Sequence, residues 1–342
     1  MGEVEFIEPR VVPRPQHPIS RSLIDRNALK VLYRLHEAGF RALLVGGSVR
    51  DLMLGRQPKD FDVATDARPN EIRRLFRNAR IIGRRFRLAH VLFKEGVIEV
   101  STFRREPEPS EQAGGPDDLL ITSDNAFGTP HQDAFRRDFT VNALFYDIAD
   151  YSVLDYTGGL DDLEARLIRA IGDPDVRFRE DPVRMMRACE LAGRLGFGME
   201  RGTQEALHRQ RGEITRAASA RLAEELVQLL QCGRAGEALQ WALDLGLLEV
   251  QLPEVYAMLT AGRRGLGDLG RILPVVDRMV ASGRGFKDTV LLAALLLLLV
   301  AVITQDALVQ PDQDHPLAAI HDHRLVVAQI GAGVARAHHC GN

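Results

Sequence analysis

The chain has 342 residues, of which 45% are hydrophobic and 27% are charged, and its formal net charge is −3 at pH 7. This composition is typical of a folded globular protein, excludes a collagen-like or strongly charged disordered chain, and is long enough for two or three domains. The three cysteines, Cys189, Cys232 and Cys340, show no Cys-x-x-Cys spacing. They therefore indicate neither a disulfide framework nor a zinc motif, and favour a reducing compartment.

The apolar segments of the sequence do not predict a membrane protein. The N-terminus shows no apolar stretch behind a basic start, as a secretory signal would. The longest apolar run, Val290–Ile303, has 14 residues, fewer than the roughly 20 that a spanning helix needs. We therefore expect a buried core helix there and a cytoplasmic protein without a membrane partner.

The hydrophobic pattern predicts a small α/β domain followed by a helical remainder. Prolines at 9, 13, 15 and 18 predict a disordered leader over 1–21. Helices and strands then alternate, in the order helix 22–39, strand 42–45, helix 49–54, strand 61–64, basic helix 69–76, hairpin strands 89–93 and 97–103, and strands 142–147 and 153–155. Helical periodicity dominates from Leu160 onward, and residues 304–342 are weakly patterned.

A glycine turn joins the strand at 42–45 to the helix that follows it. Backbone N–H groups in such a turn and at a helix N-terminus bind phosphate, which makes Gly46, Gly47 and Ser48 candidate phosphate ligands. The structural alternative is a tight turn in which Ser48 caps the helix.

Two carboxylates, Asp60 and Asp62, follow on the next predicted strand. Side chains two residues apart on a strand lie on the same face, and paired carboxylates suit a hard cation such as Mg²⁺. A metal-binding pair beside a phosphate-binding turn predicts metal-assisted phosphoryl or nucleotidyl transfer. The alternative for this pattern alone is an ordinary polar surface strand.

Residues 70–105 form a basic segment, with ten Arg and Lys against three acids. Such a segment is a candidate contact for the backbone of a nucleic acid. We expect Arg84, Arg85 and Arg87 to bind RNA; the alternative is that these arginines only solvate the surface.

A third acid is expected near the Asp60 and Asp62 pair. Asp138 begins a strand-like run over 139–146 and follows Arg137, which is suited to clamp phosphate. Glu99, on the strand 97–103, is the other candidate, and we rank Asp138 ahead of it. The structural alternative for Arg137 and Asp138 is a surface ion pair.

A further polar constellation lies at the start of the helix within 180–196. Asp181, Arg184 and Arg187 are spaced so that they share one helix face. An acceptor beside donors can read the edge of a nucleotide base. Asp181 is equally suited to cap the helix, with Pro182 at its first position.

Taken together, these motifs resemble the class II nucleotidyltransferases, the family that includes bacterial poly(A) polymerases and tRNA CCA-adding enzymes. The resemblance covers residues 25–250. It rests on VGGSVRDLMLG (45–55), DFDVAT (60–65), IIGRRFRLAHVLF (81–93), IEVSTFR (98–104), RRDFTVNALFYD (136–147) and EDPVRMMRA (180–188). The segments at 81–93 and 98–104 resemble the poly(A) polymerase branch more than the CCA-adding branch.

The resemblance implies an α+β fold: a polymerase-β-like nucleotidyltransferase head with a mixed sheet, followed by all-helical neck and body domains. We place the head at 22–155, a base-reading neck at 156–215, an RNA-binding body at 216–303 and a weakly structured tail at 304–342. In the implied site, Asp60 and Asp62 hold two Mg²⁺ ions and Asp138 is also catalytic. The implied nucleotide contacts are Gly46, Gly47, Ser48, Arg50, Arg137, Asn142, Asp181, Arg184 and Arg187.

The expected activity is template-independent addition of AMP from ATP to RNA 3′ ends. CCA addition to tRNA, with CTP and ATP, is the first alternative, and a catalytically impaired RNA-binding protein on the same fold is the second. Two features depart from the family pattern. Glu190 stands where an arginine is usual, and the sequence lacks the long basic extension of bacterial poly(A) polymerases.

Overall fold

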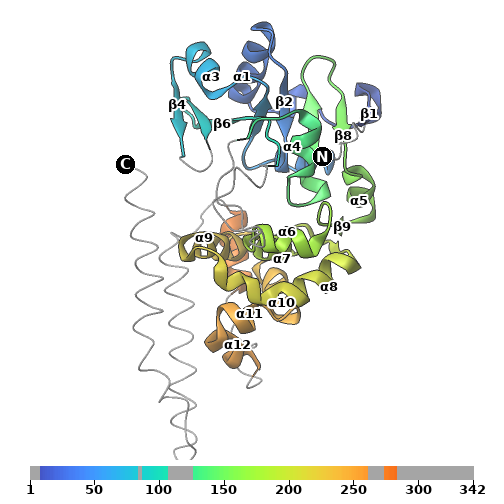
Figure 1. Ribbon diagram of the computed structural model, residues 1–342, viewed down its shortest axis with the longest axis vertical. Coiled ribbons are helices and arrows are strands. Elements are labelled where there is room, and N and C mark those ends of the chain that lie inside the picture. The colour runs from blue at the N-terminus through green and yellow to red at the C-terminus, as the bar shows by residue number, and fades with distance from the viewer. Residues whose placement is uncertain (1–7, 84–86, 107–125, 261–272, 283–342) are drawn as a thin grey trace, which may run out of the picture. The chain divides into compact units, whose positions relative to one another are not determined.

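The computed structural model describes residues 8–83, 87–106, 126–260 and 273–282 (Figure 1). The chain divides into two compact units, which meet in sequence between Asp173 and Pro174. The first unit is a mixed sheet with helices and the second is helical, as the sequence predicts.

The first unit is built on an eight-stranded sheet with the order β1-β8-β7-β2-β3-β6-β5-β4. Its strands are β1 (Arg10–Val12), β2 (Ala42–Val45), β3 (Asp62–Thr65), β4 (Ala79–Ile82), β5 (Leu88–Leu92), β6 (Val97–Thr102), β7 (Leu144–Asp147) and β8 (Val153–Asp155). Neighbouring strands are antiparallel except β3 and β6, which are parallel. A two-residue strand, β9 (Leu167–Ile168), follows near the end of the unit.

The described residues of this unit form the α-helices α1 (Arg26–Glu37), α2 (Gly47–Met53), α3 (Pro69–Leu75), α4 (Pro130–Phe135) and α5 (Gly159–Ala165). The Asp25 carboxylate caps α1 by accepting the N–H groups of Asn27 and Ala28, so the helix begins at Arg26 and not at the predicted residue 22. The apolar stripe of α1, which includes Val31 and Leu32, is fully buried. Helix α1 packs against β2, β3 and β6, and α3 packs against β4 and β5.

The segment predicted as a disordered leader differs from that expectation where the structure describes it. Arg10–Val12 forms β1, whose backbone pairs with β8 from Val153 to Asp155. Short 3-10 helices at Arg14–Gln16 and Arg21–Leu23 continue the segment. The prolines are compatible with this structure because they lie outside the paired residues.

The run at 139–146, expected as one strand, is split by a 3-10 turn. This turn, η4, spans Thr140–Asn142, and β7 begins only at Leu144. The Thr140 N–H donates to the Arg169 carbonyl and the Asn142 N–H donates to the Phe139 carbonyl. These bonds hold the turn instead of a strand ladder.

The second unit contains the helices α6 (Pro174–Glu180), α7 (Val183–Leu195), α8 (Arg201–Gln210), α9 (Ser219–Leu230), α10 (Ala235–Asp244), α11 (Leu247–Gln251) and α12 (Pro253–Thr260), with a 3-10 helix at Arg211–Arg216 and a two-residue strand, β10 (Gly198–Met199). Helix α7 packs against α6, α9 and α10. Its closest approach to α10 is at Gly193, where a Cβ would lie 2.5 Å from the Ala238 nitrogen. Glycine is therefore required at this helix crossing.

Several sequence predictions lie outside the described residues: the helix at 290–303, the tail at 304–342 and the first seven residues of the leader. The first compact unit extends past the predicted head boundary at residue 155, as far as Asp173. The boundary between neck and body at residue 215 stays a prediction. Within the described residues, no helix is long and apolar enough to cross a membrane.

Candidate active site

At one edge of the large sheet, the carboxylates of Asp62 and Glu99 lie on neighbouring strands, and Asp60 lies just before the first of these strands. Asp62 is the first residue of β3 and pairs with Val45, the last residue of β2. On the other side of β3, Val63 lies opposite Val100 of the parallel strand β6, so Asp62 is level with Glu99 and on the same face. Asp60 lies two residues before Asp62, and all three acidic residues are exposed.

The environment of Asp62 disfavours its charged form. Although the side chain keeps contact with solvent, the protein around the carboxylate desolvates it, and this is the main reason that the pKa of Asp62 rises to about 6. The negative charge of Glu99 adds to this rise, as does that of Asp60, whereas Arg137 opposes it. The positive charge of Arg137 therefore does not offset the burial of Asp62 and the negative charges of Glu99 and Asp60.

This donor set fits a divalent cation. Carboxylate oxygens are the ligands that Mg²⁺ prefers, and Mg²⁺ is typically held by one or two carboxylates together with substrate phosphates. Within the described residues, no group of three or more His, Cys, Asp or Glu side chains is placed to hold a metal ion. Asp60 and Asp62 thus offer an open, partial ligand set, with Glu99 beside it.

The glycine turn lies next to this edge, between β2 and α2. Gly46 has a φ of +73°, and a Cβ at this position would lie 3.1 Å from Arg137 Nη1. The Ser48 hydroxyl donates to the Val45 carbonyl at 2.9 Å and does not cap α2. In the described part of the chain, no side chain caps the N-terminus of α2.

Arg50 anchors a buried polar network beneath the turn. Its side chain is 2% exposed, and its Nε donates to Asp51 Oδ1 at 2.8 Å. Its Nη1 donates to Asn142 Oδ1, and Asn142 Nδ2 in turn donates to Asp138 Oδ1 at 3.2 Å. The structure therefore places Asp138 in this network, while Glu99 is the acid that lies level with Asp62.

The positively charged side chain of Arg137 lies near this edge. Its guanidinium donates to Asp133 Oδ2 through Nε at 3.1 Å and Nη2 at 2.9 Å. Its Nη1 donates to the Asn142 carbonyl at 3.4 Å, and the group stacks 5.2 Å from the Phe145 ring centroid. These contacts fix the orientation of a partly exposed positive charge near Gly46 and Asp62.

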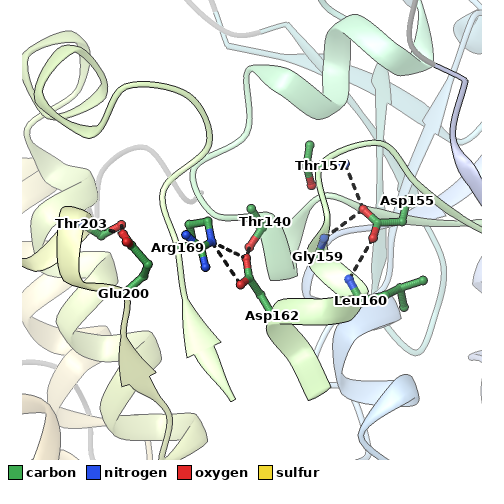
Figure 2. Close-up of polar contacts among 9 residues, drawn as sticks. All are labelled: Thr140, Asp155, Thr157, Gly159, Leu160, Asp162, Arg169, Glu200 and Thr203. Atoms are coloured by element: carbon green, nitrogen blue, oxygen red, sulfur yellow. Dashed lines mark hydrogen bonds and ion pairs between the residues drawn. The ribbon is translucent and has the colours of Figure 1, made fainter. Parts of the chain in front are cut away.

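Asp162 holds the turn η4, which carries Asn142, and Asp155 holds the neighbouring start of α5 (Figure 2). Asp162 Oδ2 accepts the Thr140 hydroxyl at 2.7 Å and Arg169 Nε at 3.0 Å. Asp155 accepts the N–H groups of Gly159 and Leu160 and thereby fixes the start of α5. Asp162 cannot be identified from the sequence, because its role depends on contact with a turn 22 residues earlier.

In the second unit, Asp181 forms a two-pronged ion pair with Arg221, with distances of 2.8 and 2.9 Å. Burial alone would raise the pKa of Asp181, but the bonds from Arg221 outweigh it, and the pKa is lowered. Asp181 is not the N-cap of α7, which is Pro182. The capping interpretation of Asp181 is therefore wrong.

The other members of the predicted base-reading set are distributed around α7. Arg184 is buried and donates to the Arg177 carbonyl and to Glu180 Oε2. Arg187 is exposed. Glu190, the departure from the family pattern, pairs with Arg194 at 2.8 Å on the same helix.

The predicted RNA contacts Arg84 and Arg85 lie outside the described residues. Arg87 is exposed, and its carbonyl accepts Arg104 Nη2 at 3.2 Å.

We expect Asp62→Asn to stabilise the cation-free protein at high pH. Because folding raises the pKa of Asp62, its contribution to stability is fully present below the pKa of the unfolded chain and is lost as pH rises through about 6. In EDTA, the variant should melt above wild type at about pH 8, and the difference should vanish toward about pH 4. Asp161→Asn, at an exposed aspartate, is the matched control. A pH-independent difference would contradict this account of the site.

Family models of known proteins match parts of both units of the chain. A family model described as the poly(A) polymerase head domain matches residues 42–169, and a model of the probable RNA- and SrmB-binding site of polymerase A matches 196–259. Poly(A) polymerase I of Salmonella typhi is 48% identical over 255 residues, covering 73% of this chain and 55% of that protein. The CCA-adding enzyme of Bacillus subtilis is 37% identical, covering 67% and 56%. The chain thus spans about half the length of the curated relatives it matches.

Solved structures show the same fold. The Bacillus stearothermophilus CCA-adding enzyme in complex with CTP aligns with a TM-score of 0.61 at 29% identity, covering 72% of this chain and 58% of that one. A tRNA nucleotidyltransferase complexed with a primer tRNA and an incoming ATP analog aligns with a TM-score of 0.60 at 30% identity, covering 79% and 75%. The chain therefore belongs to the class II nucleotidyltransferase family, which includes the bacterial poly(A) polymerases and the CCA-adding enzymes.

Proposed function

We propose that this chain adds AMP from ATP to RNA 3′ ends without a template and releases pyrophosphate. The observation that carries the proposal is the 48% identity to a poly(A) polymerase I. The carboxylates Asp60, Asp62 and Glu99 support the chemistry, because they lie at one sheet edge within the region that the head-domain model matches.

Asp60 and Asp62 are the residues that would hold two Mg²⁺ ions. When bound, Mg²⁺ would neutralise the triphosphate and favour ionisation of the attacking 3′-hydroxyl. The chain itself supplies position and charge. Arg137 offers a fixed positive charge to phosphate, and the Gly46–Gly47 turn lets backbone come close to it. Such positioning carries most of the rate in phosphoryl-group transfer.

We assign the place of the third acid to Glu99, because the register of β3 and β6 sets it beside Asp62. Asp138 then acts through Asn142, which bonds to Arg50. Arg50 and Asn142 support the turn from below, while Gly46, Gly47 and Ser48 are proposed to face the triphosphate. Asp181, Arg184 and Arg187 are proposed to read the incoming base.

CCA addition is the second candidate, because the solved relatives include CCA-adding enzymes at TM-scores near 0.6. Both activities use the same carboxylates and differ in the nucleotide that they accept. A purely RNA-binding role is the third candidate. The nucleotides incorporated into RNA distinguish all three.

The first test is incorporation of each NTP into a 5′-labelled oligo(A) and into a tRNA that lacks CCA. We expect wild type to extend oligo(A) with ATP into long products and to use CTP poorly on either RNA. Asp60→Ala should reduce incorporation by at least about a thousandfold, because one metal-binding carboxylate is lost. Asp161→Ala, at an exposed aspartate, should retain activity.

Addition of two C residues and one A to the tRNA would instead identify a CCA-adding enzyme. RNA binding without any incorporation would identify the RNA-binding protein. Wild-type activity in Asp60→Ala would contradict the proposed chemistry.

The second test distinguishes two roles of Asp181: reading of the nucleotide base and the structural ion pair with Arg221. Asp181→Asn removes both the ion pair and the charged acceptor, whereas Arg221→Gln removes the ion pair and keeps Asp181. If Asp181 reads the base, Asp181→Asn should reduce the preference for ATP over the other NTPs by about tenfold. Arg221→Gln should lower the melting temperature and change this preference much less. Equal preference in wild type and Asp181→Asn would leave Asp181 a structural residue.

A further inference from the structure

A row of charged side chains extends the carboxylate edge across the sheet. Glu99 of β6 lies opposite His90 of β5, and His90 lies opposite Arg80 of β4. Directly paired residues lie on the same face, so Asp62, Glu99, His90 and Arg80 follow one another across four strands. At about 4.8 Å between strands, Arg80 lies about 14 Å from Asp62 along the row.

Over β4, β5 and β6, side chains on this face reach solvent in the part of the chain that the structure describes, whereas the other face is covered. Ala89, Val91 and Val100 are at most 1% exposed, and they alternate along β5 and β6 with residues that reach solvent. Because α1 and α3 pack against these strands, they cover the face of the buried residues. On the open face, Arg80 is exposed and Ile82, two residues further along β4, is 45% exposed.

The row is acidic at one end and basic at the other. Within the described part of the chain, Arg80 makes no ion pair or side-chain hydrogen bond. His90 Nε2 lies 3.2 Å from Glu99 Oε1, which orients that carboxylate beside Asp62. The basic end is therefore available to a phosphate, and the acidic end lies at the edge that is proposed to bind cations.

The geometry of in-line transfer predicts from which side of Asp62 the RNA approaches. The attacking oxygen and the leaving group take opposite sides of the phosphate that is transferred. The proposed triphosphate contacts, Gly46 and Arg137, lie on the β2 side of Asp62. The attacking hydroxyl then approaches from the β6 side, where the open face begins.

We infer that the open face of β4, β5 and β6 is the acceptor site, which binds the 3′-terminal segment of a single-stranded RNA. Arg80 contacts a backbone phosphate, and Ile82 packs against a neighbouring sugar or base. This inference rests on the proposed function. It also selects among the basic residues of 70–105, because Arg73 and Arg74 lie on α3, on the opposite face of the sheet.

The test is binding of a 5′-fluorescein-labelled oligo(A) to the full chain, measured by fluorescence anisotropy over a series of salt concentrations. The variants are Arg80→Gln, Arg80→Lys and the matched control Arg73→Gln, which removes an exposed arginine from the same basic segment. We expect Arg80→Gln to weaken binding about tenfold and to reduce the slope of log affinity against log salt by about 0.7. Arg80→Lys should restore most of the affinity, and Arg73→Gln should match wild type.

Steady-state incorporation supplies the second readout. Arg80→Gln should raise KM for RNA and leave KM for ATP, and kcat at saturating RNA, unchanged. Equal weakening by Arg80→Gln and Arg73→Gln, or no binding of oligo(A) by wild type, would overturn the assignment. Normal binding and extension by Arg80→Gln would overturn it while leaving the proposed function intact. Wild type could also bind oligo(A) but incorporate no nucleotide. If Arg80→Gln then lost the binding, the RNA-binding role of this face would be supported and the proposed function would be refuted.

Discussion

The constraint on which the site depends is the crowding of negative charge at the start of β3. Strand pairing, rather than local sequence, creates it: β6 runs parallel to β3, and this register sets Glu99 beside Asp62. Backbone hydrogen bonds of the sheet hold the carboxylates together against their mutual repulsion. The raised pKa of Asp62, to about 6, reflects this surrounding protein and charge. A bound cation would relieve the same repulsion, which is why we propose this edge as the Mg²⁺ site.

The neighbouring elements keep this edge in place through buried polar contacts. Asn142 accepts a bond from Arg50 and donates one to Asp138. The turn that carries Asn142 is held by the Thr140 bond to Asp162. Because buried polar groups are costly to leave without partners, these bonds give the glycine turn a defined position. The position of the turn is therefore fixed by contacts within the first unit.

Much of the fold and part of the site could be predicted from the sequence. The glycine turn followed by Asp60 and Asp62 is local, so strand alternation and turn chemistry were sufficient to identify it. The position of Glu99, in contrast, depends on a strand that is distant in the sequence. Its place beside Asp62 depends on the pairing of β6 with β3, and a single sequence does not reveal which strands become neighbours. The sequence ranks Asp138 ahead because Glu99 lies in a basic segment that could pair it, yet Asn142 Nδ2 donates to Asp138 Oδ1 and joins it to the Arg50 network.

In the helical unit too, contacts between residues distant in the sequence could not be predicted. The spacing of Asp181 and Arg184 indicated a shared helix face, and capping was the simplest structural role for Asp181. The structure instead joins Asp181 to Arg221, 40 residues later, a contact that helix packing alone determines. The basic segment was likewise recognised by composition, but only the sheet separates Arg80 on the open face from Arg73 on α3. Composition identifies a charged segment, and topology decides which of its residues can meet the same ligand.

The edge that carries Asp60, Asp62 and Glu99 is proposed to bind divalent cations together with nucleotide. Binding of Mn²⁺ to the full chain, measured by electron paramagnetic resonance of the free ion with and without a non-hydrolysable ATP analogue, tests it directly. The account predicts weak binding alone, tighter binding with the analogue, and a loss of at least about tenfold in Asp62→Asn. Equal Mn²⁺ affinity in wild type and Asp62→Asn, with no effect of the analogue, would contradict it.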